Sequence, residues 1–75
     1  MSPLQCRLAR TALGFGVRDL AALASVSPDT VARFDRGETL KPATVERLRA
    51  VLEEAGVVFL DASDGEGEGV RLRAS

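Results

Sequence analysis

Apolar side chains recur at helical spacing over residues 2–55, in four short segments that glycine, serine and proline separate. The first segment opens on Ser2 and Pro3, and Gln5 stands where it completes a capping box with Ser2. Gly14 is placed to end this helix, because glycine readily adopts the left-handed backbone beyond a helix C-terminus. The apolar residues expected on its inner face are Leu4, Cys6, Ala9 and Leu13.

Three more helices are predicted over residues 17–24, 28–36 and about 42–55, and Gly37 and Gly56 end the last two. Only residues 25–27 separate the first two of these helices, so the helices must cross at a steep angle. The small side chains of Ala21 and Ala24 allow such a close approach. The residues expected to point inward from the last helix are Val45, Leu48, Leu52 and Ala55.

The hydrophobic period changes after Gly56. Residues 57–60 form a β-branched and aromatic run, and residues 70–73 alternate apolar and charged side chains, which predicts two strands. Residues 61–69 are rich in glycine and acid, so they predict a long loop between the strands. A lone two-stranded hairpin is marginally stable and needs a helix or a second subunit to lie against. The predicted fold class is therefore mainly α, with four to five short helices and a C-terminal β-hairpin or strand.

Length and composition restrict the class of protein. Seventy-five residues make one small domain. The sequence has no run of 18 apolar residues, and its start does not have the pattern of a signal peptide, so we expect no membrane partner. A single cysteine forms no internal disulfide, which favours a cytoplasmic location.

The two ends of the chain differ in charge. Residues 1–50 carry eight Lys and Arg side chains against five Asp and Glu, whereas residues 51–75 carry two against six. The net charge of −1 therefore hides a mildly basic helical part and an acidic tail. Ordinary solvated surfaces can also produce such an asymmetry.

The predicted helix over residues 28–36 leaves a polar edge exposed, formed by Asp29, Thr30 and Arg33. A short helix, a tight turn and an exposed second helix form the shape of a helix-turn-helix that reads the major groove. From Cys6 to about Leu52 the chain resembles the Cro/CI-type (XRE family) helix-turn-helix domain of phage repressors and bacterial regulators. The matching residues are Arg10, Gly14, Phe15, Leu20, Ala21, Ala24, Val26, Ser27, Thr30, Val31, Phe34, Asp35, Gly37, Pro42 and Leu48.

The resemblance implies a lambda-repressor-like helical domain over residues 1–56 that binds double-stranded DNA as a dimer. The residues it implies at the bases are Arg33, Asp29, Pro28 and Thr30. Arginine suits guanine O6 and N7, while Asp29 either accepts a hydrogen bond from cytosine N4, serves the helix dipole or repels phosphate. Pro28 offers only apolar contact, for instance to a thymine methyl group, and Thr30 contacts the groove or a phosphate.

A second set of residues is expected at the DNA backbone, where contacts position a protein without reading sequence. These residues are Ser27, Arg18, Arg36, Thr39 and Lys41. Ser27 is also the expected N-cap of the recognition helix. At the start of the preceding helix, the family commonly has a polar pair that binds the DNA backbone. Gly16 and Val17 replace that pair here, so Arg18 is the candidate for the backbone contact.

Two residues are implied by the resemblance to be structural. Arg10 would pair with Asp35 and fix the recognition helix on the first helix, and losing one partner of such a pair would cost about 3 kcal/mol. Cys6 lies on the inner face of the first helix, where it acts as a small hydrophobic residue.

The C-terminal element, residues 57–75, is a candidate for dimerisation. Its candidate interface residues are Val58, Phe59, Leu60, Val70 and Leu72. Alternatively, these side chains cap the last helix within one monomer. The acidic loop around Asp64, Glu66 and Glu68 is expected to avoid DNA, and it either lacks order or faces a protein partner.

The residues do not suggest an enzyme, because the chain has no histidine, no paired cysteines and no metal-ligand spacing, and no cofactor is predicted. We expect a transcriptional regulator that binds an inverted-repeat operator as a homodimer, as a repressor or autoregulator, in the cytoplasm and on the nucleoid when bound. The alternative is a protein-interaction module on the same fold, such as an antitoxin or a polymerase-contacting adaptor or activator. DNA binding would weaken steeply as salt rises, which distinguishes the two hypotheses.

Overall fold

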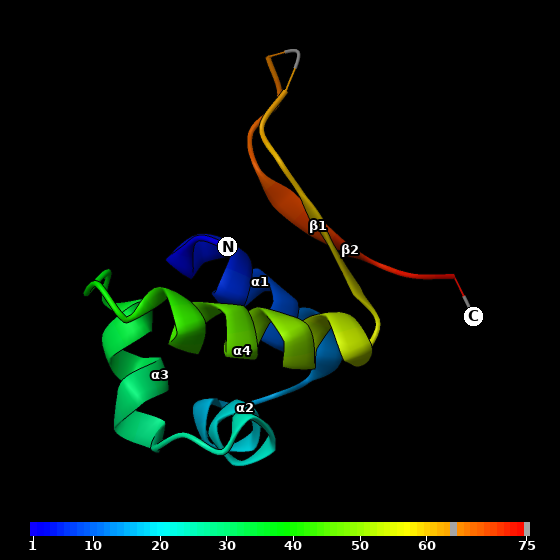
Figure 1. Ribbon diagram of the computed structural model, residues 1–75. Coiled ribbons are helices and arrows are strands. Elements are labelled where there is room, and N and C mark those ends of the chain that lie inside the picture. Colours follow the sequence, from blue (N-terminus) through cyan, green and yellow to red (C-terminus); the bar gives the residue numbers. More distant parts are fainter. Residues whose placement is uncertain (64, 75) are drawn as a thin grey trace.

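The computed structural model describes residues 1–63 and 65–74, and within these residues the fold is four helices followed by a two-stranded antiparallel sheet. The mainly α fold class is thereby confirmed at this coarse level. Figure 1 shows the helices gathered into one body, from which the hairpin projects. The elements are α1 (Pro3–Leu13), α2 (Val17–Ala24), α3 (Pro28–Asp35), α4 (Pro42–Glu54), β1 (Val57–Leu60) and β2 (Gly69–Leu72).

Local capping signals explain where the helices begin and end. The Ser2 hydroxyl accepts a hydrogen bond from the Gln5 amide (3.1 Å), and the Gln5 side chain accepts one from the Ser2 amide (3.0 Å), which confirms the capping box. Gly14 ends α1 with a left-handed φ of 73°. Asp19 accepts from the Gly16 amide (2.8 Å) and so caps α2, a role that the sequence analysis missed.

The core lies between the four helices and the start of β1. Its buried members are Cys6, Ala9, Leu20, Ala21, Ala24, Val31, Phe34, Leu48, Leu52 and Val57. Two expected inner positions are wrong, since Leu4 and Ala55 are exposed. In α1, Cys6 and Ala9 are buried as expected, but Gln5 is buried in place of Leu4.

The buried Gln5 side chain explains how the hairpin is held. Its amide nitrogen donates to the carbonyl oxygens of Leu60 (3.0 Å) and Gly69 (3.3 Å), which face each other across β1 and β2. The sheet pairs Val57 with Leu72 and Phe59 with Val70, so the second strand begins one residue earlier than predicted. β2 packs on α1 and β1 packs on α4. The predicted hairpin therefore lies against helices of its own chain.

No helix in the described part of the chain is both long enough and apolar enough to cross a membrane.

Candidate nucleic-acid interface

The crossing of α2 and α3 depends on the tight turn between them. Ser25 adopts a left-handed backbone with φ 56°, and the Val26 amide donates to the Ala21 carbonyl (3.0 Å), which reverses the chain within three residues. Ala21 and Ala24 are buried where α2 meets α3, and Arg47 of α4 donates to the Ala24 carbonyl. α3 is thus held against the rest of the fold at a fixed angle.

One face of α3 is buried and the opposite edge is free. Val31 and Phe34 enter the core, whereas Pro28 and Asp29 are exposed. α3 packs on α2 and α1, while the hairpin packs on α1 and α4, away from α3 (Figure 1). The tail of the chain, as far as it is described, therefore leaves the outer edge of α3 open.

The two charged residues of this edge contact each other. Arg33 Nε lies 3.3 Å from Asp29 Oδ2, one helical turn away, and the side chains are 43% and 74% exposed. Such an exposed ion pair contributes little to stability. A ligand of opposite charge that binds more strongly can therefore replace either residue as the partner of the other. The i, i+4 spacing of the two residues in the sequence is the signal that could have revealed this pair.

The start of α3 is closed by its own side chains. Ser27 is the N-cap, and its hydroxyl accepts from the Thr30 amide (3.2 Å) and lies 2.9 Å from the Thr30 hydroxyl. Ser27 is exposed and Thr30 is half-buried. The predicted N-cap role of Ser27 is confirmed. Ser27 and Thr30, both predicted to contact DNA, are hydrogen-bonded to each other through their hydroxyls.

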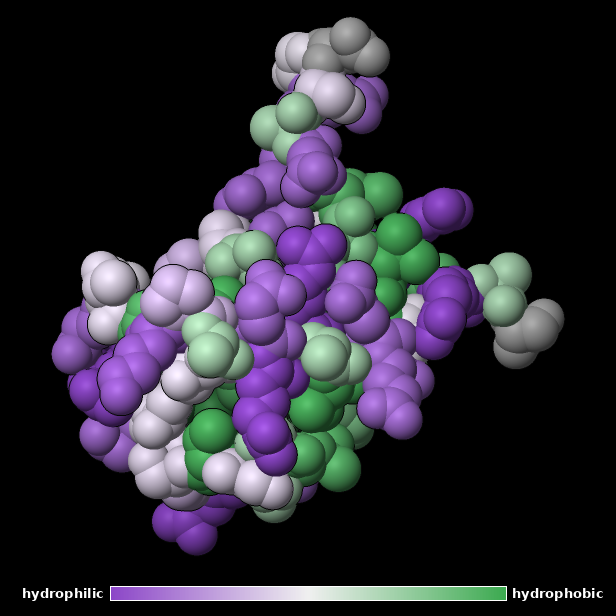
Figure 2. Space-filling view, in the orientation of Figure 1, coloured by the Kyte–Doolittle hydropathy of each residue, from purple (hydrophilic) through white to green (hydrophobic). Residues whose placement is uncertain are grey.

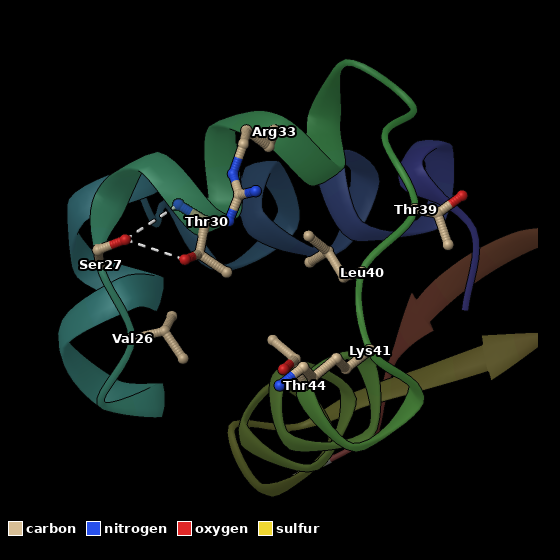
Figure 3. Close-up of a pocket in the computed structure, with 8 residues that line it drawn as sticks. All are labelled: Val26, Ser27, Thr30, Arg33, Thr39, Leu40, Lys41 and Thr44. Carbon is tan, nitrogen blue, oxygen red and sulfur yellow. Dashed lines mark hydrogen bonds between the residues drawn. The ribbon is translucent and has the colours of Figure 1, made fainter.

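A cavity of about 430 Å³ lies between the start of α3, the segment 39–41 and the start of α4 (Figure 3). Arg33 extends from α3 toward this space, and Lys41 lies on the opposite wall. The hydroxyl of Thr39 is turned away from the centre in this view. The lining residues are Val26, Ser27, Thr30, Arg33, Thr39, Leu40, Lys41 and Thr44. Of these, the sequence analysis did not single out Leu40 and Thr44, and it saw in Val26 only a family match.

Two other predicted backbone contacts, Arg18 and Arg36, lie outside this cavity. Arg36 is exposed at the C-cap of α3 and pairs with Glu38 (2.9 Å). Arg18 is exposed in the first turn of α2. Lys41 is exposed as well, and it forms no ion pair with any residue that the structure describes. The structure thus brings together Ser27, Thr30, Arg33, Thr39 and Lys41 around one cavity, but not Arg18 or Arg36.

An ion pair joins the C-terminal end of α3 to α1. Arg10 donates to Asp35 Oδ2, and the two side chains are only 12% and 17% exposed. Arg10 Nε and Asp35 Oδ1 are buried and make no hydrogen bond to the described residues. Arg7 donates to the Asp35 carbonyl (2.8 Å), a second brace that the sequence analysis did not predict. These contacts join the C-terminal end of α3 to α1.

Cys6 lies beside this pair in the core. Burial raises the pKa of its thiol above the ordinary value, and the Asp35 carboxylate raises it further, against a lowering by Arg10. The thiol is therefore neutral and enclosed, as expected for a small core residue.

The predicted interface residues of the hairpin differ in how deeply they are buried. Phe59 and Val70 pack against the core of their own chain, and the guanidinium of Arg49 lies 5.1 Å from the Phe59 ring centre. Val58 is half-buried. Leu60 and Leu72 are 41% and 50% exposed. Figure 2 shows apolar surface gathered at the base of the hairpin. Of the acidic loop, Glu66 and Glu68 are exposed, and Asp64 lies outside the described residues.

Among residues 1–63 and 65–74, no three His, Cys, Asp or Glu side chains are placed to hold a metal ion. The sequence matches no model of a protein family, and a comparison with curated proteins finds no similar sequence.

Proposed function

We propose that the protein is a sequence-specific, DNA-binding transcriptional regulator with a lambda-repressor-like helical domain of the Cro/CI type. The observation that carries the proposal is the open polar edge of α3, which Val31 and Phe34 anchor from the other side. The short turn from α2 into α3 supports it further, because this geometry suits insertion of the second helix into the major groove.

In this function, α3 reads base edges. Arg33 leaves Asp29 and forms a two-pronged hydrogen bond with guanine, which discriminates between bases by about 1–3 kcal/mol. Once Arg33 has left it, Asp29 accepts from cytosine N4, serves the helix dipole or repels phosphate. Pro28 gives apolar contact only, and Thr30 reaches the groove or a phosphate. Readout is therefore sparse and centred on one arginine.

The backbone contacts surround this edge. Lys41, Arg36 and Arg18 neutralise phosphates, and the hydroxyls of Ser27 and Thr39 donate to them. Because a single small reading head binds weakly, we propose a homodimer on a near-palindromic operator with half-sites about 10 bp apart. Leu60 and Leu72 are the exposed hairpin residues available for subunit contact. Occlusion of a promoter, including the protein's own, is the regulatory outcome that we propose.

The salt dependence of binding to a duplex of random sequence tests the nucleic-acid part of this proposal. With three cations on phosphates, raising the salt from about 50 to about 200 mM should weaken binding about 40-fold per protomer. Lys41→Gln should reduce the slope of log affinity against log salt by the amount that one phosphate contact contributes, about 0.9. The matched control Arg71→Gln, on the exposed hairpin surface, should leave the slope unchanged. Affinity that does not depend on salt would contradict the proposal.

One observation favours the alternative function, a protein-interaction module such as an antitoxin or a polymerase-contacting adaptor. A second, mostly apolar hollow of about 370 Å³ lies between α2 and α4, with Leu23 exposed beside it. Its lining residues are Phe15, Leu23, Val51, Glu54 and Ala55. Apolar binding there would respond weakly to salt, and Leu23→Glu would abolish it without changing DNA affinity.

A further inference from the structure

The cavity between α3 and α4 concentrates groups that bind oxyanions. Arg33 and Lys41 face it from two elements, and none of the described lining residues is acidic. Its volume of about 430 Å³ lies within the range of small-molecule sites, roughly 300–1,000 Å³, and exceeds the space that a single ion needs.

The hydrogen-bond donors around the cavity are largely unused. The guanidinium of Arg33 carries five donors, and it makes no hydrogen bond to any residue in the described part of the chain. The Ser27 and Thr30 hydroxyls share one hydrogen bond, so whichever one donates, the other keeps a free proton. The Thr44 hydroxyl adds another potential donor from α4.

These donors match a phosphate group in charge and number. A phosphate monoester carries about two negative charges and three acceptor oxygens, and arginine and lysine are the side chains that bind it best. Asp29 lies outside the lining, but its Oδ2 atom is 3.3 Å from Arg33 Nε. An entering phosphate would therefore have to displace Asp29 from Arg33.

We propose that this cavity binds the phosphate group of a small phosphorylated molecule, with Arg33 and Lys41 as its charged ligands. The remaining space holds part of the organic portion, beside the apolar side chains of Val26 and Leu40. The same phosphate chemistry could come from a DNA backbone, so the test must separate the two sources. If the proposed DNA-binding function holds, the ligand and the operator compete for Arg33 and Lys41, and the ligand releases the protein from DNA.

The test is a titration of the ¹⁵N-labelled full chain, followed by backbone amide shifts of residues 27–44 at constant ionic strength. One arm uses inorganic phosphate, and the other uses a dinucleoside monophosphate, which carries a single phosphodiester. We expect saturable shifts with inorganic phosphate. Arg33→Ala and Lys41→Ala should each weaken its binding about tenfold or more. Asp29→Asn should strengthen it, because the competing carboxylate is removed.

Arg36→Ala is the matched control, since it removes the same charge outside the cavity and should leave phosphate affinity unchanged. Shifts that do not saturate would overturn the proposal, as would equal losses in Arg36→Ala and Arg33→Ala. Saturation by the phosphodiester alone would also overturn it and assign the cavity to a nucleic-acid backbone. No duplex is used, so this result is separate from success or failure of the proposed DNA binding.

Discussion

The ion pair between Arg10 and Asp35 sets the position of α3, and removing either partner should destabilise the fold. One hydrogen bond joins the two groups, and an atom on each side makes none to the residues that the structure describes. When one side chain is truncated, the other charge remains in a site that is less than one-fifth exposed. The free energy of unfolding should fall by about 3 kcal/mol in Arg10→Ala and in Asp35→Ala.

This magnitude is large for so small a domain. A chain of 75 residues has a total stability of about 4–11 kcal/mol. A loss of about 3 kcal/mol should lower the unfolding midpoint by about 12–24 °C. In the double variant, neither charge is stranded, so the combined loss should be smaller than the sum of the single losses by about 1–3 kcal/mol.

Urea unfolding followed by far-UV circular dichroism measures these values, since the chain has no tryptophan or tyrosine for fluorescence. The control is Glu38→Ala, which breaks the exposed pair with Arg36 and should cost less than about 1 kcal/mol. Single losses as small as that of the control, or strictly additive losses, would refute the idea that this pair fixes α3.

Three further predictions concern other parts of the fold. Gln5→Ala should strip two hairpin carbonyls of their donor, cost about 1–3 kcal/mol and speed hydrogen exchange of the hairpin amides; unchanged exchange would contradict this. Because burial raises the pKa of Cys6 in the folded state, the unfolded chain ionises first, near pH 9.0, so stability should fall above that pH; Cys6→Ala should lack this part of the fall. Leu60→Glu combined with Leu72→Glu should sediment as a monomer if the hairpin joins two subunits, and a persistent dimer would place the interface elsewhere.

Helix bounds could be predicted from the sequence because the signals that set them are local. The capping box of Ser2 and Gln5, the left-handed Gly14 and Pro28 at the first position of α3 each act within a few residues. The hairpin followed in the same way from its β-branched run and alternating pattern. The shift of β2 by one residue is within the usual uncertainty of strand ends.

The failures have long-range causes. Leu4 and Gln5 are adjacent, and the choice between them depends on carbonyl groups more than fifty residues away, which Gln5 reaches and leucine could not satisfy. Periodicity alone therefore placed Leu4 on the inner face of α1 wrongly, although it placed Cys6 and Ala9 there correctly. The ion pair of Arg10 and Asp35 came from the resemblance, since no local pattern connects residues that far apart.

The candidate site was foreseen in composition but not in arrangement. From the sequence, Arg33 was predicted on the exposed edge of a helix and Lys41 in the segment that follows this helix. It did not show that a cavity lies between them, because that space depends on how α4 packs beside α3. Thr44 carried no signal of a site in the sequence, because a threonine in the first turn of a helix is common.

Selection of bound duplexes from a random DNA pool tests the central claim most directly, namely that the outer edge of α3 reads bases. We predict enrichment of a two-fold symmetric motif with half-sites about 10 bp apart, and loss of preference at one position of each half-site when Arg33→Ala is used. No enrichment with the native chain, or an unchanged motif with Arg33→Ala, would contradict the account.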